Sequence, residues 1–145
     1  MFGIYKPTRT LKLWEIVINV KPQSKQSISG GGGNFFVPAR KKLYGASLRG
    51  FCERNQPESP FKCPMKLEVF FGFPFNKNEK VENKRRGWYW KTVRPDLDNL
   101  EKPLDALVRA KIIADDSWIV KKESEKISTK DTEGYIHIVL KRLFY

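Results

Sequence analysis

The strands that this sequence predicts are marked by alternation of apolar and polar residues. Residues 66–73 and 135–140 alternate in this way, which is the pattern of a strand with one buried face. Residues 11–20 are rich in β-branched side chains and residues 88–93 are rich in aromatic ones, and both predict further strands. Another strand is expected to begin at residues 118–120 and to continue through the charged segment that follows.

Helical spacing of apolar residues predicts two main helices. Residues 40–54 carry two neighbouring rows of side chains at four-residue spacing, namely Leu43, Ser47 and Phe51, and beside them Tyr44, Leu48 and Cys52. Residues 100–113 repeat the spacing with Leu100, Leu104, Leu107 and Ala110. The order of elements predicts one small domain over residues 1–145, of the α/β (α+β) class, with a mixed sheet.

Two stretches without apolar periodicity, residues 21–34 and 76–87, predict mobile basic loops. The first is rich in Ser and Gly but lacks the Gly-Lys-Ser/Thr ending of a phosphate-binding P-loop. No apolar run reaches the ~18 residues of a membrane span, and no signal peptide is recognisable, so we expect a cytoplasmic protein. Cys52 and Cys63 lack metal-ligand spacing and are expected to be reduced core thiols.

The chain is strongly basic, with 28 Lys and Arg against 16 Asp and Glu and a net charge of +12. This excess favours a nucleic-acid partner, because each phosphate that is neutralised releases a counterion. The alternative explanations of the charge are general solubility and assembly with an acidic protein partner. We expect DNA contacts from basic side chains in the two loops and before the acidic stretch, at Lys21, Lys25, Lys77, Lys80, Lys84, Arg85, Arg86 and Arg94.

Against this basic background, four aspartates occupy one part of the sequence. Asp96 and Asp98 stand one residue apart, and Asp115 and Asp116 follow the second expected helix. Mg²⁺ prefers oxygen ligands and keeps several waters, so two or three carboxylates are enough to hold it. We predict that Asp96, Asp98 and Asp116 bind Mg²⁺, for which Mn²⁺ can substitute, and that Asp115 points away or binds a second ion. Lys102 can bind the scissile phosphate, orient the attacking water or protonate the leaving oxygen.

Each of these residues alone also has a structural interpretation. Asp-x-Asp before a helix is a suitable N-cap, Asp98 and Lys102 can form an ordinary i,i+4 pair, and Asp115-Asp116 before Ser117 is typical of a turn. On that interpretation the chain is a non-catalytic, basic DNA-binding protein.

The string PDLDNLEK over residues 95–102, with LDAL at 104–107 and the later pair Asp115-Asp116, resembles the RusA family of Holliday junction resolvases. These are small endonucleases of bacteria and phages. The resemblance is close from residue 94 to about residue 122, and the rest of the chain is similar in layout. It implies a RusA-like fold, a homodimer and Mg²⁺-dependent cleavage of four-way DNA junctions by paired symmetric nicks, in DNA recombination and repair.

The resemblance places the metal aspartates of the family on Asp96, Asp98 and Asp116, its essential lysine on Lys102 and its accompanying acidic residue on Asp115. The chain departs from the family at two points. The spacing between Lys102 and Asp105 is one residue shorter than in the family and includes Pro103, so we expect the helix to begin later than is usual in the family. Residues 76–87 form a longer basic insertion, so cleavage of other branched DNA is an alternative.

Overall fold

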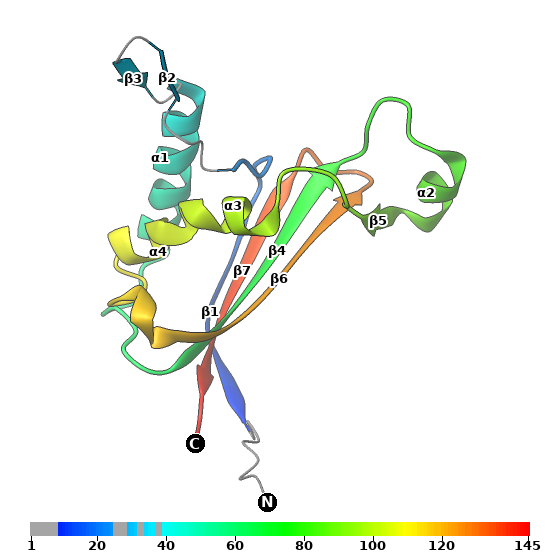
Figure 1. The fold of residues 1–145 in the computed structure, drawn as a ribbon. Helices are drawn as coiled ribbons and strands as arrows, with labels where there is room; N and C mark the ends of the chain where they lie inside the picture. Colours follow the sequence, from blue (N-terminus) through cyan, green and yellow to red (C-terminus); the bar gives the residue numbers. More distant parts are fainter. Residues whose placement is uncertain (1–8, 25–28, 32–33, 37–38) are drawn as a thin grey trace, which may run out of the picture.

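The sheet is the framework of the molecule. The computed structural model describes residues 9–24, 29–31, 34–36 and 39–145. Five strands form one mixed sheet in the order β1-β7-β4-β6-β5, in which β4 and β6 are parallel and the other neighbours antiparallel (Figure 1). Their bounds are β1 Thr10–Ile18, β4 Met65–Pro74, β5 Trp88–Trp90, β6 Ile119–Thr129 and β7 Tyr135–Leu143. The predicted mixed sheet in a small α+β domain is confirmed.

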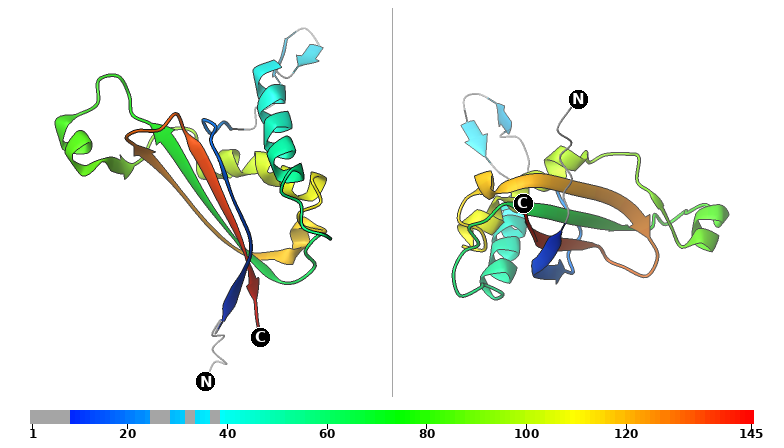
Figure 2. Two further views of the ribbon diagram at one scale, coloured as in Figure 1. Left: turned by 180° about the vertical axis from the view of Figure 1, so that it is seen from behind. Right: turned by 90° about the horizontal axis from the view of Figure 1, so that it is seen from below.

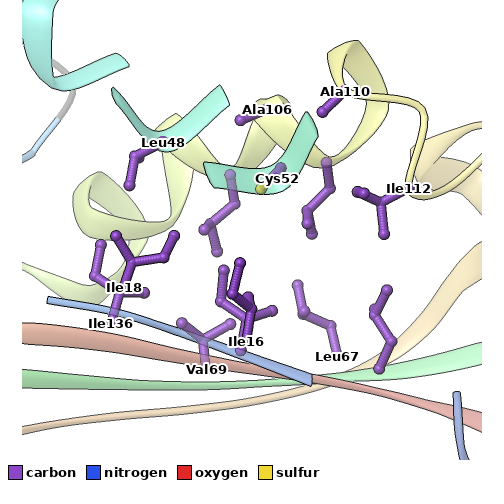
Figure 3. Packing of buried hydrophobic residues seen from close by; sticks show 14 of the residues in the cluster. Ile16, Ile18, Leu48, Cys52, Leu67, Val69, Ala106, Ala110, Ile112 and Ile136 are labelled. Carbon is purple, nitrogen blue, oxygen red and sulfur yellow. The ribbon is translucent and has the colours of Figure 1, made fainter. Parts of the chain in front are cut away.

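One face of the sheet is apolar and carries the core. Alternate residues of β4, among them Leu67, Val69 and Phe71, are buried, as are Ile136 and Ile138 of β7. Successive side chains of a strand point to opposite faces, so this alternation assigns one face of each strand to the core. Figure 3 shows Leu67, Val69 and Ile136 packed beneath side chains from α1 and α4.

The first predicted helix is present as α1, Ala39–Glu53. Of the two rows that the spacing allowed, the buried one contains Tyr44, Leu48 and Cys52, whereas Leu43 is 69% exposed. Both cysteines are free, and burial, followed by the nearby charge of Glu53, raises the pKa of the Cys52 thiol to about 11. Cys52 therefore behaves as a packing residue, as expected.

The second predicted helix is not continuous, so this expectation was wrong in its form. The chain instead forms α3, Leu97–Glu101, a 3₁₀ turn η1 over Lys102–Asp105, and α4, Ala106–Arg109. Proline has no backbone N–H to donate, and Pro103 lies in the first turn of η1. The first helical segment also begins at Leu97, before the Leu100 at which the apolar spacing placed the start.

Both predicted loops contain short elements of secondary structure, which corrects that part of the prediction, and their mobility stays a prediction. Residues 76–87 contain a short helix, α2, Val81–Arg86, which ends at Gly87 with a φ of 87°. The Glu79 carboxylate stabilises its start by accepting hydrogen bonds from Asn83 at 2.9 Å and from the Tyr89 hydroxyl at 3.0 Å. In the other loop, β2, Ser29–Gly31, pairs with β3, Asn34–Phe36.

The helices divide between the two ends of the sheet. In Figures 1 and 2, α1 and α4 lie toward one end, whereas α2 and β5 project from the opposite end. The segment from β5 through α3 runs between these ends (Figure 1). Within the described residues, no helix has the length and apolarity needed to cross a membrane.

Candidate active site

A lysine on β6 holds the segment that leads into the predicted aspartates. The Lys126 ammonium donates hydrogen bonds to the carbonyl oxygens of Val93 and Pro95, both at 2.8 Å. The backbone carbonyl of Lys126 also accepts from the Lys91 N–H at 3.2 Å. The chain between β5 and α3 is thus attached to the sheet directly before Asp96.

Asp96 and Asp98 are both exposed where α3 begins. Asp96 occupies the N-cap position in extended backbone, yet its side chain makes no capping hydrogen bond. Lys102 donates to Asn99 Oδ1 at 2.8 Å, and no ion pair joins it to Asp98 among the described residues. The two structural roles considered for these residues are therefore not used in this conformation.

Lys102 and Asp116 line the same pocket, which has a volume of about 290 Å³. Asp116 is the first residue of the 3₁₀ turn η2, Asp116–Trp118, which leads into β6. Glu101 and Lys122 line the pocket as well. The Glu101 carboxylate accepts hydrogen bonds from Ser124 and from Lys122, the latter at 3.5 Å, and so ties the end of α3 to β6.

Asp115, the neighbour of Asp116, caps its own turn. Its carboxylate accepts hydrogen bonds from the backbone N–H and the hydroxyl of Ser117. These bonds, the hydroxyl bond above all, hold the pKa of Asp115 below its ordinary value. The side chain is therefore occupied by the turn, and a metal-binding role for it stays a prediction.

The structure does not gather three aspartates around one point. Within the part of the chain that is described, no group of three or more His, Cys, Asp or Glu side chains forms a metal-binding cluster. Mg²⁺ usually binds proteins through one or two carboxylates together with substrate phosphates and waters. Asp96 and Asp98 are exposed carboxylates, which are chemically suited to bind Mg²⁺ in this way. The assignment of one shared ion to Asp96, Asp98 and Asp116 stays a prediction.

Most of the predicted DNA-contacting residues are exposed. These are Lys21, Lys77, Lys80, Lys84, Arg85, Arg86 and Arg94, while Lys25 lies outside the described residues. Lys91 was not predicted, and it lies 4.7 Å from the centre of the Phe73 ring. Burial, and then the charges of Lys126 and Lys21, hold the pKa of Lys91 below its ordinary value, so these three cations lie near one another.

Sequence reasoning missed the roles of Glu101, Lys122 and Lys126. All three connect β6 to the segment around α3. Their partners are distant in sequence, so only the register of β6 reveals them. The sequence contains one weak signal of these roles. Lys122, Ser124 and Lys126 are alternate residues of this charged strand, so their side chains share one face of it. The register places that face on the core side of the sheet, beside Leu67 and Phe71.

With this geometry established, comparison with known proteins identifies the class as an endodeoxyribonuclease. The family described as Endodeoxyribonuclease RusA matches residues 18–139, and the chain belongs to this family. A curated relative, the crossover junction endodeoxyribonuclease rusA of Lactococcus phage r1t, is 33% identical over 119 residues, covering 80% of this chain and 86% of the relative. The resemblance drawn from residues 94–122 and the prediction of an endodeoxyribonuclease are confirmed.

Proposed function

We propose that the protein resolves Holliday junctions, acting as a Mg²⁺-dependent homodimer that makes paired symmetric nicks. The observation that carries the proposal is the pocket shared by Lys102 and Asp116, with exposed Asp96 and Asp98 at the start of the adjacent helix. Membership of the RusA family and the junction-cleaving activity for which the phage relative is named support a four-way junction as the substrate.

In this proposal, Asp96, Asp98 and Asp116 hold the metal. When bound, Mg²⁺ would activate a water and neutralise charge that develops on the phosphate. Lys102 faces the same pocket as Asp116, so its ammonium is suited to bind a phosphate oxygen or to donate a proton to the leaving oxygen. Lys126 keeps Asp96 in place through the carbonyl of Pro95.

The dimer follows from the symmetry of the substrate. A four-way junction with two-fold symmetry presents two equivalent strands, and a symmetric dimer offers one equivalent site to each. Simultaneous engagement of both strands explains how the nicks come to be paired. Exposed cations on each protomer, such as Lys84, Arg85 and Arg94, would grip the arms through their phosphates.

The decisive experiment incubates the purified protein with a fixed four-way junction and with a linear duplex, each with Mg²⁺, Mn²⁺ or EDTA. We expect nicks only in the junction, only with metal, and at symmetric positions in opposed strands. Asp98→Asn should abolish cleavage and preserve junction binding in EDTA, because it removes a metal ligand but no cation. Asp131→Asn is the matched control, since Asp131 is exposed in a turn with a φ of 58°, which asparagine tolerates.

Three results would contradict the proposal. Junction binding that is indifferent to Mg²⁺, with no nicking under any condition, would indicate a non-catalytic DNA-binding protein. Metal-dependent cutting of flaps or forks in preference to four-way junctions would preserve the active site and change the substrate. Cleavage by Asp98→Asn at the wild-type rate would remove Asp98 from the site.

A further inference from the structure

Two tryptophans on the edge strand β5 are exposed. Trp88 is 37% exposed and Trp90 is 57% exposed, although both are large and apolar. Tyr89, between them, points to the opposite face of the strand, where it donates a hydrogen bond to Glu79 and stacks on Phe75 with ring centres 5.9 Å apart. Tyr89 alone is therefore integrated into the fold, while the indoles of Trp88 and Trp90 remain on the surface.

The two indoles meet at a right angle. Their ring centres are 5.0 Å apart and their planes are inclined by 89°. In such an edge-to-face contact the two rings cannot cover each other's faces. They line an open hollow of about 290 Å³ together with Glu125, Ile127 and Thr129, so ring surface is available to a bound group.

Basic residues lie next to the strand that carries this hollow, and none of them lines it. The last turn of α2 consists of Lys84, Arg85 and Arg86, and only Gly87 separates it from Trp88. Lys130 is also close, because its backbone N–H bonds to the Gly87 carbonyl at 3.0 Å. The one charged group lining the hollow is the carboxylate of Glu125, which repels phosphate. The hollow thus suits an uncharged aromatic group whose attached phosphates lie against α2.

We propose that Trp88 and Trp90 form a stacking site for an unpaired nucleobase of the DNA. Base stacking on aromatic side chains contributes about 1–3 kcal/mol per base and tolerates any sequence. Bases inside a duplex are already stacked and paired, so the site discriminates in favour of DNA whose pairing is disturbed, as at a branch point. This deepens the proposed function, because it assigns part of the junction selectivity to residues outside the metal site.

The stacking site and the candidate active site both involve β6, on opposite faces of the sheet. Trp90 pairs with Ile127, the residue after Lys126, and Lys126 holds the segment that ends at Asp96. Because successive side chains of a strand point to opposite faces, DNA bound at both sites would pass around the edge that β5 forms. A second copy of the chain is a poorer occupant of this edge, since pairing β5 with itself would bring the cations of two α2 helices together. A polyanion instead neutralises them.

The test measures binding in EDTA, where no cleavage can interfere. Anisotropy titrations use three labelled probes, which are a four-way junction, a linear duplex and a short oligothymidylate. We expect the double variant Trp88→Ala/Trp90→Ala to bind oligothymidylate and junction about 10-fold more weakly, and duplex within about 2-fold of the wild type. Trp88→Phe/Trp90→Phe retains aromatic faces and should recover most of the affinity. Val120→Ala, another exposed apolar residue at 62% exposure, is the control.

A second readout places 2-aminopurine at the branch point of the junction. We expect its fluorescence to change when the wild type or the Phe variant binds, and to stay unchanged with the double Ala variant. Equal affinities of the wild type and the Ala variant for oligothymidylate and junction would overturn the proposal. A double Ala variant that becomes monomeric with unchanged DNA binding would also overturn it, by assigning β5 to self-association.

The outcomes separate this inference from the proposed function. If the wild type binds oligothymidylate through the tryptophans but never nicks a junction, the stacking site stands and the nuclease proposal fails. If the Ala variant binds and nicks junctions like the wild type, the nuclease proposal stands and the stacking site fails.

Discussion

The Lys126 ammonium lies 2.8 Å from the carbonyl oxygen of Pro95, the residue that precedes Asp96. A second hydrogen bond of 2.8 Å joins the same ammonium to the carbonyl of Val93. These two bonds from one strand restrict the path of the chain directly before Asp96, the first predicted metal ligand. Displacement of a catalytic group by about 1 Å can reduce a rate 10²-fold, so this attachment should matter for cleavage.

We therefore expect Lys126→Met to lower the rate of junction cleavage about 10- to 100-fold. The loss should be larger at low Mg²⁺ and partly recovered at high Mg²⁺, because the defect is one of ligand positioning. Lys126→Arg retains two or more donors and should keep more activity. Cleavage rates measured across a Mg²⁺ titration would check this.

Lys121→Met is the matched control, since Lys121 is an exposed residue of the same strand. An equal loss in the Lys121 and Lys126 variants would mean that the effect is general charge loss. Unchanged cleavage by Lys126→Met at every metal concentration would show that the attachment is dispensable.

A pair of leucines on α1 tests which row of the helix packs on the sheet. Leu48 is 2% exposed and Leu43 is 69% exposed. We expect Leu48→Ala to lower the free energy of unfolding by about 2–5 kcal/mol, because it removes buried methyl groups and leaves a cavity. Leu43→Ala should change it by no more than about 0.5 kcal/mol. Urea denaturation of both variants measures the difference, and equal losses would contradict the observed orientation of α1.

These two leucines also show how far the sequence alone could lead. Four-residue spacing predicts a helix at residues 40–54 equally well from the row of Leu43 and from the row of Leu48, so the existence of α1 was predictable and its buried face was not. Strands β4 and β7 were predictable because their alternation is strict. The parallel pairing of β4 with β6 depends on which strands meet in space, and no periodicity encodes it.

The misses in the candidate site have similar causes. The helix α2 arises from specific bonds to Glu79 within a charged segment that has no apolar pattern. The helix breaks after α3 because of Pro103. The sequence did not show where this break would fall, because that depends on the residue at which α3 begins. Asp96, Asp98, Lys102 and Asp116 were found because their spacing is local in sequence, whereas the bonds of Lys126 span more than thirty residues.

Glu68 predicts a dependence of stability on pH. It is 8% exposed and lies between Lys66 at 2.9 Å and Lys141 at 3.0 Å. Burial acts to raise the pKa of this carboxyl, but hydrogen bonds and charge from Lys66 and Lys141 outweigh it, so the pKa lies below the ordinary value of 4.5. A lowered pKa in the folded state stabilises the fold above pH 4.5, and this contribution is lost as the pH falls through the folded-state pKa.

We expect Glu68→Gln to be less stable than the wild type by about 1–3 kcal/mol at neutral pH. The difference should shrink as the pH falls below about 4, since protonation removes the same charge from the wild type. Denaturation of both proteins over a pH series measures this convergence. Glu58→Gln, at an exposed position, should show no such trend, and a difference for Glu68→Gln that stays constant with pH would contradict the ion-pair account.

Substitutions at Lys102 distinguish a role in binding the phosphate from a role in protonating the leaving oxygen. Lys102→Met should reduce junction cleavage about 100-fold or more while junction affinity in EDTA changes little, because one cation among many is lost. Lys102→Arg retains the positive charge but cannot release a proton near neutral pH. If Lys102 acts by charge on the phosphate, the Arg variant should recover much of the rate; if it protonates the leaving oxygen, the Arg variant should be as slow as the Met variant. Lys62→Met, at an exposed position outside the pocket, controls for loss of charge, and wild-type cleavage by Lys102→Met would exclude every one of these roles.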